Sequence, residues 1–473
     1  MVLCVLVALV STACGSRLPD DVLESIDAGN RSGDTTGTEA QGTTGTSTAN
    51  GPSASENSPG TAVAGESTTN GGGTGPSGGG GPSSGPVAVA SKCDDAKSDA
   101  PGVTDDEIKV ASIVTDSGPL PGATEGSFRG AASYFAMVNA NGGVCGRKVT
   151  IVKGDDGLDP AKARGEFLRL EPQVFAFVGN YAVADSGYSN LIGPSGIPYV
   201  SLSVDPAGRE ARNVFPRTAT GYVNTGPMVY LKQKFPKVKD AAVLYANIGA
   251  VAANVPGFQA AVKKAGFNLK YSAGAEVTSP DFTPEVRQAQ EEGIDFFYLF
   301  AFEVNMHVRM VRNMRQQNYN PPIKGSNIAF NTRFSQLLGK DGDGWLNHNA
   351  HLIFLDPTER NRSKGLAQFL DWNERVFPGA QLDLFPVSGW GRAALFTEAL
   401  RKLEDSITRK GLIDALYTIK RFDGGGIESP IDPTTGLGEA CFNMAVHKGG
   451  RWVRSYPADK LYECSLGENF KFK

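Results

Sequence analysis

The sequence has few of the residues on which common enzyme sites depend. Its 473 residues include only four histidines, and the patterns G-x-x-x-x-G-K-[ST], H-E-x-x-H and, at the first strand–helix turn, G-x-G-x-x-G are missing. The nucleophile pattern G-x-S-x-G occurs at residues 75–79 and 81–85, but in a Gly/Ser-rich stretch without the strand and helix that a nucleophile needs. We therefore expect no enzymatic activity and no cofactor.

A strong charge excess is also absent. The net charge is −4, from 46 Lys and Arg against 50 Asp and Glu, and no basic cluster with interleaved aromatics occurs. Such a balance gives no electrostatic reason to expect binding to nucleic acid.

The apolar run at residues 2–10 is too short to span a bilayer and is typical of a signal-peptide core. The residues that follow it, Ser11-Thr12-Ala13-Cys14, resemble a bacterial lipobox, in which the cysteine is lipidated. We therefore expect a signal peptide over residues 1–14 with lipidation at Cys14. Secretion without an anchor, or a misassigned start, is the alternative.

Aromatic and branched apolar residues are almost absent from residues 15–92, which are rich in Gly, Ser, Thr and Pro. Such a segment cannot bury a core, so it is predicted to be a disordered linker. A flexible tether of roughly 75 residues has a root-mean-square span of about 45–50 Å. The remainder is long enough for two lobes of ordinary size.

Four cysteines lie in this remainder, and an exported chain meets oxidising conditions. An even number predicts two disulfides, and four cysteines allow three pairings. Local pairing favours Cys93 with Cys145 and Cys441 with Cys464. Zinc is not expected, because no C-x-x-C spacing occurs and the nearest histidine, His447, is isolated.

Strand and helix patterns alternate through the globular part. Repeated βα units of this length predict a parallel sheet with right-handed crossovers. The series restarts near residue 217, which predicts a second α/β lobe, and it closes with helices and a hairpin-like pair of strands. The predicted strands cover residues 107–114, 148–156, 174–180, 198–203, 240–249, 268–277, 295–302, 323–330, 350–355, 441–450 and 451–457.

The stretch "IKVASIVTDSGPLPGATEGSFRGAASYFAMVNANGG" resembles the opening of type I periplasmic binding proteins of the branched-chain amino acid (Leu/Ile/Val) ABC-transporter class. The segments "GIPYVSLS", "FPRTA", "AVKKAGF" and "IDFFYLF" are similar to the same family, in the same order. The resemblance implies an α/β fold of two Rossmann-like lobes, joined by a three-crossover hinge that closes on a ligand in the cleft.

The resemblance also implies how the chain is divided. The crossovers are expected near residues 217–220, 354–357 and 430–435. The lobes are expected to be discontinuous, with residues 105–219 and 356–432 in lobe 1, and residues 220–355 and 433–473 in lobe 2.

Ligands of open α/β sheets bind at the carboxyl ends of strands, which makes the following loops the candidate site. In "VFAFVGNYAVADSG" a strand ends in a tight turn, and the ring of Tyr181 either covers the cleft or packs at the lobe surface. Ser117 either binds ligand or caps the first helix. The residues expected at the site are Ser117, Tyr181, Ala182, Ser203, Asp205, Asn247, Phe302, Glu303 and Asn305.

Several of these residues have an equally plain structural interpretation. Phe300 and Phe302 are predicted to face the same way, because strand residues alternate, but that direction is either cleft or core. Glu303 and Asn305 open a helix, where capping alone would explain them.

Two polar pairs are interpreted as structural. Asp155 and Asp156 are expected to form a strand-end turn rather than a catalytic couple. His348 and His351 share a helical spacing in a loop context, which predicts solvent exposure rather than metal binding.

In the branched-chain amino acid binders, hydroxyl side chains hold the ligand carboxylate, and a Tyr and a Glu of the second lobe hold its ammonium. The corresponding positions here are Ala184, Asp205, Val251 and Asn305. An ionised Asp205 within about 4 Å of a carboxylate would repel it by about 4 kcal/mol at an effective dielectric of 20. We expect leucine, isoleucine and valine to bind poorly and the ligand to be neutral, cationic or aromatic. A register shift would bring Ser186 and Ser203 to these positions and restore the carboxylate site.

These features predict an extracytoplasmic solute-binding lipoprotein of an ABC importer, monomeric and anchored to the bacterial cell membrane by its lipid. Its expected partners are ABC permease subunits and a small organic ligand, which is amino acid-like or an aromatic or amide compound. The alternative is an extracellular ligand-sensing module that signals through a membrane partner.

Overall fold

The first sheet forms from strands near the start of the described chain. The computed structural model describes Cys93 and residues 95–473, so the predicted signal peptide, Cys14 and the predicted linker lie outside the described residues. Five parallel strands lie in the order β2-β1-β3-β4-β5. Their bounds are β1 (Glu107–Val114), β2 (Lys148–Asp155), β3 (Ala176–Val178), β4 (Tyr199–Val200) and β5 (Val214–Phe215).

Helices cover both faces of this sheet because its side chains alternate between them. Ile108 and Val110 belong to the core on one face, and Ala111 and Ile113 to the core on the other. The first face packs against α2 (Gly126–Ala140), α12 (Leu384–Leu400) and α13 (Arg409–Thr418). The second packs against α3 (Pro160–Leu170) and α4 (Ser189–Ser195). We call this sheet with its five helices the first lobe.

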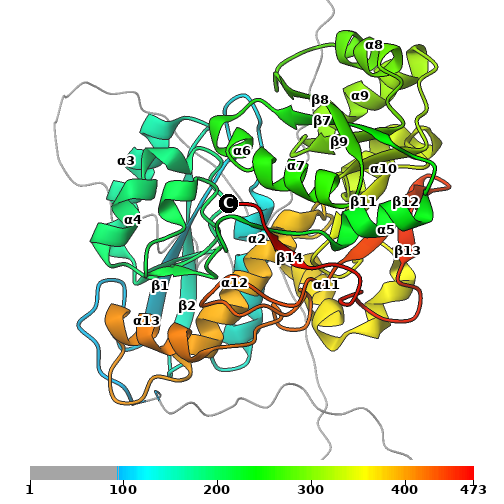
Figure 1. Ribbon diagram of the computed structural model, residues 1–473. Coiled ribbons are helices and arrows are strands. Elements are labelled where there is room, and N and C mark those ends of the chain that lie inside the picture. The colour runs from blue at the N-terminus through cyan, green and yellow to red at the C-terminus, as the bar shows by residue number, and fades with distance from the viewer. Residues whose placement is uncertain (1–92, 94) are drawn as a thin grey trace, which may run out of the picture.

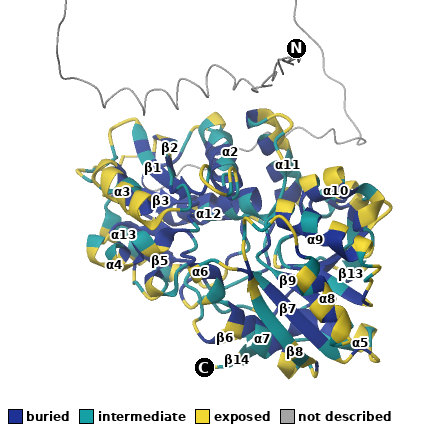
Figure 2. Cartoon of the chain, turned by 90° about the horizontal axis from the view of Figure 1, so that it is seen from above, coloured by how far each residue is buried: buried dark blue, intermediate teal, exposed yellow. Residues whose placement is uncertain are grey.

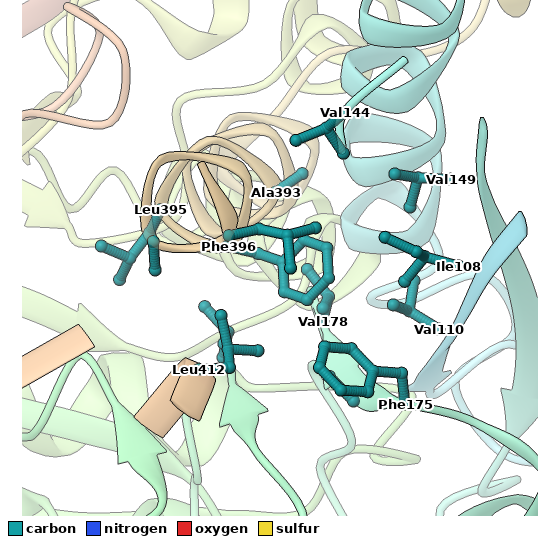
Figure 3. Packing of buried hydrophobic residues seen from close by; sticks show 14 of the residues in the cluster. Ile108, Val110, Val144, Val149, Phe175, Val178, Ala393, Leu395, Phe396 and Leu412 are labelled. Atoms are coloured by element: carbon teal, nitrogen blue, oxygen red, sulfur yellow. The ribbon is translucent and has the colours of Figure 1, made fainter. Parts of the chain in front are cut away.

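Figure 1 shows the orange helices α12 and α13 beside the blue and cyan strands β1 and β2, although they are distant in sequence. Figure 3 shows Phe396 and Leu412 from these helices in the same core as Val110, Phe175 and Val178. The first lobe is therefore built from two separate parts of the chain.

Small residues allow α12 to lie directly on α2. A Cβ on Gly130 would come within 1.9 Å of the Pro386 carbonyl oxygen, and one on Gly389 within 1.8 Å of the Ser127 carbonyl oxygen. No side chain fits at either position, so the contact depends on glycine in both helices.

The second sheet has seven strands in the order β13-β12-β11-β10-β9-β7-β8. Strands β7 to β11 pair in parallel, and the hairpin of β12 and β13 adds to the edge in antiparallel fashion. The bounds are β7 (Asp240–Ala246), β8 (Asn268–Ala275), β9 (Phe296–Phe300), β10 (Ile323–Ser326), β11 (Leu346–Asn349), β12 (Asn443–Lys448) and β13 (Arg451–Tyr456).

This sheet is also covered on both faces. One face packs against α8 (Thr283–Glu291), α9 (Val304–Gln316) and α10 (Thr332–Leu338), and the other against α5 (Gly226–Lys234) and α7 (Val255–Lys264). Figure 2 shows buried residues concentrated in strands such as β7 and β9, and exposed residues on outward faces of helices such as α10. We call this sheet with its five helices, and the short α6 (Gly249–Ala252), the second lobe. A two-stranded ribbon pairs β6 (Tyr222–Asn224) with β14 (Asn469–Lys471).

Helix α11 (Lys364–Val376) packs between the lobes rather than wholly on the first. Its Leu366 and Phe369 belong to the same core as the second sheet, and the Phe369 ring lies 5.6 Å from that of Trp390 in α12. Trp390 in turn contacts Tyr134 of α2 at 4.9 Å between ring centroids. An aromatic chain thus connects the two lobes.

Three chain segments pass from one lobe to the other and lie against each other. The Arg217 N–H donates to the Pro433 carbonyl at 2.8 Å, and the Ser429 N–H donates to the Ala350 carbonyl at 2.7 Å. Gly436 has a φ of +72°, and a Cβ there would lie 2.0 Å from the Arg217 carbonyl oxygen. Arg217 and Pro433 lie within the ranges expected for the first and third crossovers, whereas Ala350 and Ser429 lie just outside the ranges expected for the second and third.

Both disulfides have the favoured pairing. Cys93 is bonded to Cys145, and Cys441 to Cys464. The first ties the start of the described chain to the segment after α2, and the second ties the segment just before β12 to the C-terminal segment.

Most predicted elements are present, but one strand is wrong. Residues 350–355 do not form a strand; β11 lies immediately before them, and they run as an irregular segment in which His351 bridges to Glu428. The irregular conformation follows from their place in a crossover. Among the described residues, no helix is both long enough and apolar enough to cross a membrane.

Candidate ligand-binding site

A cavity of about 380 Å³ lies between the two lobes, at the carboxyl ends of strands from both sheets. We call it the inner cavity. Its larger apolar side chains are Leu120, Tyr181, Val183, Leu202, Val204, Ile248, Val251, Phe300, Val304, Ile328, Leu384 and Phe385. Its polar side chains are Thr124, Arg209, Thr218, Asn254, Glu303, Asn305, Asn327, Asn331, Arg333, Gln381 and Asp383. A wall of this kind suits an organic molecule with an apolar body.

The turn after β3 places Tyr181 in this wall. The Tyr181 N–H donates to the Ile113 carbonyl at 3.0 Å, and the Thr124 hydroxyl donates to the Tyr181 carbonyl at 2.5 Å. The ring then meets Phe385 edge to face, with 4.7 Å between centroids. The backbone of Tyr181 is thus fixed from both sides, and its ring faces the inner cavity instead of the outer surface of the lobe.

The end of β9 separates two phenylalanines that were expected to face the same way. Ala301 has a φ of +56°, so the strand alternation stops at Phe300. Phe300 lines the inner cavity, whereas Phe302 is fully buried in the core of the second lobe. The expectation that both rings share one direction is therefore wrong.

Glu303 lines the inner cavity and also caps α9. Its carboxylate accepts from the N–H groups of Asn305 and Met306, each at 2.7 Å. The capping interpretation of Glu303 is therefore confirmed, and much of its charge is balanced by the start of its own helix. Contact between Glu303 and a ligand stays a prediction. Asn305 is exposed at the same rim.

Arg209 connects the lobes beside the inner cavity. Its Nε donates to the Ser203 carbonyl at 2.8 Å, and Nη2 donates to the Val204 carbonyl. Its Nη1 donates across the cleft to the Asn254 Oδ1 at 2.7 Å, between α6 and α7 of the second lobe. All three nitrogens of the guanidinium are hydrogen-bonded, so the arginine acts as a link between the lobes.

A buried carboxylate holds the loop from which Arg209 reaches. The Asp185 side chain accepts from the Ser203 hydroxyl at 2.8 Å and from the N–H groups of Val204 and Asp205 at 2.7 and 2.8 Å. Burial raises the pKa of Asp185 to about 7, against the lowering effect of these three donors. Asp185 therefore shapes the first-lobe wall without itself lining the inner cavity.

Asp383 is the carboxylate of the first lobe that does line the cavity. It is the N-cap residue of α12, and its carboxylate accepts from the Phe385 N–H at 2.8 Å. Burial raises its pKa to about 6, while the Phe385 N–H and the charge of Arg129 lower it.

Six of the residues expected at the site do not line the inner cavity: Ser117, Ala182, Ser203, Asp205, Asn247 and Phe302. Ala182 is buried in the first lobe, and the Asn247 amide donates to Glu276 at 2.5 Å. Ser117 does not cap α2, whose N-cap residue is Glu125; its hydroxyl donates to Asp155 at 2.5 Å.

The Asp155–Asp156 turn is structural, as expected. Asp155 also pairs with Lys162 at 2.5 Å, and Asp156 accepts from the N–H groups of Leu158 and Ala184 at 2.8 and 2.9 Å. These bonds join the ends of β2 and β3.

Asp205 does not line the inner cavity. Its carboxylate accepts from the Ala207 N–H at 2.8 Å and caps a short 3₁₀ turn (Pro206–Gly208). The expected repulsion of a ligand carboxylate by Asp205 therefore has no basis here. The alternative, in which Ser186 and Ser203 bind a ligand carboxylate, has no basis either. Ser203 donates to Asp185, and neither serine lines the inner cavity.

The two histidines expected to be solvent-exposed are half-buried. His348 lies in β11, where its Nδ1 is 2.9 Å from the Tyr298 hydroxyl and its ring stacks on Phe258. His351 lies in the crossover, with its Nδ1 3.0 Å from the Leu352 carbonyl. The sequence interpretation placed His348 in a loop and missed strand β11. It therefore also missed the packing of His348 against the core of the second lobe.

The residues of the site that the sequence did not single out include Arg209, Asn254, Asp383 and Phe385. An Asp before an apolar helix start is a capping signal, which marks Asp383. Nothing in the sequence places α12 at the cleft. Arg209 lies four residues beyond Asp205, the last residue expected at the site in that loop.

Comparisons with known proteins agree with this geometry. Residues 107–451 match the family described as periplasmic binding protein. The Leu/Ile/Val/Thr-binding protein of Salmonella typhimurium is 26% identical over 247 residues, which are 51% of this chain and 67% of that protein.

Solved structures share the fold. A fatty acid ABC transporter substrate-binding protein from Thermomonospora curvata has a TM-score of 0.64 at 21% identity, covering 79% of this chain and 97% of its own. A solute-binding protein from R. palustris in complex with 4-hydroxybenzoate has a TM-score of 0.61 at 17% identity, covering 76% and 98%.

Removing the acceptor of the interlobe hydrogen bond should favour opening of the lobes. Asn254→Ala deletes the hydrogen bond from Arg209. The free energy of the closed arrangement should rise relative to the open one by about 1.5 kcal/mol, as expected for a bond to a charged group. Small-angle X-ray scattering without ligand should show a larger radius of gyration than for the wild type. Asn247→Ala, which changes an amide outside the inner cavity, is the control, and equal radii for all three proteins would contradict the prediction.

The Asp383 carboxyl should make stability depend on pH between about 4 and 6. Its pKa in the folded protein is about 6, above the usual value, so the folded state holds a proton that the unfolded state loses. The wild type should therefore lose stability as pH rises through this window. Asn also caps helices, so Asp383→Asn should lack this loss. Urea unfolding at pH 4 to 8 measures the free energy of unfolding of both proteins. The value for the variant should rise relative to that of the wild type between pH 4 and pH 6. A difference that does not change with pH would refute the assignment.

Proposed function

The chain belongs to the periplasmic binding protein family, and from this we propose that it is an extracytoplasmic solute-binding protein of an ABC importer. The observation that carries the proposal is the inner cavity, which lies between two lobes, has a large apolar part in its wall and is flanked by the Arg209–Asn254 hydrogen bond. A ligand enclosed there contacts both lobes at once, which favours their closed arrangement. The protein binds its ligand and releases it unchanged.

We propose that the lobes comprise residues 105–219 and 356–432, and residues 220–355 and 433–473. The two sheets and the three adjoining crossovers support this division. Helix α11 contributes to the core of the second sheet and contacts α12. In this division it would be the part of the first lobe that closure moves least against the second.

The proposed ligand is a small organic molecule with an aliphatic or aromatic body. Tyr181 and Phe300 supply aromatic contact area from opposite lobes, and Asn305 supplies a polar group at the rim. The relatives and structural neighbours bind an amino acid, a fatty acid and 4-hydroxybenzoate, according to their names. The apolar wall supports the last two classes over an amino acid.

The proposed location is the outer side of the cell membrane. Support comes from the apolar run at residues 2–10 and the lipobox-like sequence ending at Cys14. A lipid on Cys14 would hold the lobes near the permease through the predicted linker.

Leucine, isoleucine and valine should bind at least about 100-fold more weakly than octanoate or 4-hydroxybenzoate. The positions at which those binders carry their hydroxyl side chains are Ala184 and Asp205 here, and neither lines the inner cavity. Each lost bond to a charged group weakens binding about tenfold or more. Calorimetry with the purified protein tests this, and each ligand should be recovered unchanged. Micromolar binding of leucine, or a converted product, would contradict the proposal.

A variant pair tests whether the same cavity is used. Tyr181→Ala should weaken octanoate binding about tenfold, because an aromatic wall is lost. Tyr245→Ala, which removes a half-buried ring of β7 outside the inner cavity, should have no effect.

Anchoring should depend on Cys14. Cys14→Ser removes the thiol that receives the lipid, so the variant should leave the membrane fraction and accumulate in the soluble extracytoplasmic fraction. Fractionation followed by immunoblotting measures this. Equal membrane retention of the two proteins would show that the anchor lies elsewhere.

A further inference from the structure

A second cavity opens directly from the first toward the outside of the cleft. Its volume is about 520 Å³, and it shares Leu120, Pro121, Glu303, Asn305 and Arg333 with the inner cavity. We call it the outer chamber. One side is the loop after β1, and the other is formed by α9, α10 and the segment after β8. A ligand in the inner cavity therefore has one end at the outer chamber.

Three arginines of the second lobe converge on this chamber. Arg309 and Arg312 lie three residues apart on α9 and share a face of that helix, and Arg333 lies at the start of α10. Arg312 and Arg333 are exposed. Arg309 donates from Nη2 to the Val277 carbonyl at 2.9 Å, with its guanidinium 5.6 Å from the centre of the Phe282 ring.

These charges are not balanced within the described part of the chain. None of the three arginines forms an ion pair with a described carboxylate, whereas Arg315, further along α9, pairs with Asp341 at 3.1 Å. Glu303 is the carboxylate that lines the outer chamber, and both of its oxygens accept from the N–H groups at the start of α9. The chamber therefore has an excess of positive charge that its own carboxylate does not neutralise.

We infer that the ligand is an amphipathic organic acid, with its apolar body in the inner cavity and its anionic group in the outer chamber. This inference rests on the proposed function and specifies its ligand. An anion at the junction of the two cavities can accept hydrogen bonds from Arg312 and Arg333, neither of which pairs with a carboxylate of the described chain. A zwitterionic amino acid gains less, because its ammonium group enters the same positive field.

The arrangement also affects the rate of binding. A positive chamber at the mouth of the cleft attracts an anion before it enters, and salt screens this attraction. The association rate of an acid should therefore fall with ionic strength more steeply than that of a neutral analogue of the same shape.

Matched acid and amide pairs test the inference directly. We expect octanoate to bind at least about tenfold more tightly than octanamide, and 4-phenylbutyrate than its amide, by calorimetry at low salt. In the double variant Arg312→Gln/Arg333→Gln the ratio of acid to amide affinity should fall close to one. Arg315→Gln removes an arginine from the same helix outside the chamber and should keep the wild-type ratio.

The outcomes separate the two proposals. Equal affinities for acid and amide, or an acid preference that survives the double variant, would overturn the inference about the outer chamber. Binding of the amide would leave the proposed solute-binding function intact in that case. If neither the acids nor the amides bind, both the inferred anionic ligand and the proposed aliphatic or aromatic body of the ligand are wrong.

Discussion

The close contact between α2 and α12 is the constraint on which the binding site depends. Gly130 and Gly389 let the two helices approach until backbone meets backbone, with no room for a Cβ on either side. This contact fixes the start of α12, and so brings Asp383 and Phe385 into the cavity wall beside Tyr181. A larger residue at either glycine would move α12 outward and widen the cavity between the lobes.

The order of elements was predictable because the apolar patterns are long and regular. Strand β1 and the β12–β13 hairpin lie where the patterns place them, and both disulfides follow the local pairing. The prediction failed where tertiary contacts decide the conformation. Residues 350–355 are apolar enough for a strand, but they pass between the lobes and pair with residues 427–429 instead.

The site was predictable only as a set of loops. The strand-end rule locates Tyr181, Glu303 and Asn305, all of which line the inner cavity. It could not show that a positive φ at Ala301 turns Phe300 toward the cavity while Phe302 joins the core. Nor could it show that Ser203 is already occupied by Asp185, because no sequence pattern links the two. Arg209 and Asn254 contact each other only once both lobes are folded, so neither stands out along the chain.

The division of the first lobe between two distant parts of the chain has a consequence for how the protein is made. The sheet strands from β1 to β5 leave the ribosome well before α12 and α13, whose Phe396 and Leu412 complete their core. Until then only α2 covers that face of the sheet. The parallel strands β7 to β11 of the second lobe, by contrast, are contiguous in sequence, so their contacts are more local and form sooner. A chain in the course of synthesis therefore carries a partly exposed apolar sheet face while most of the second lobe is being made. During this interval it most needs a chaperone.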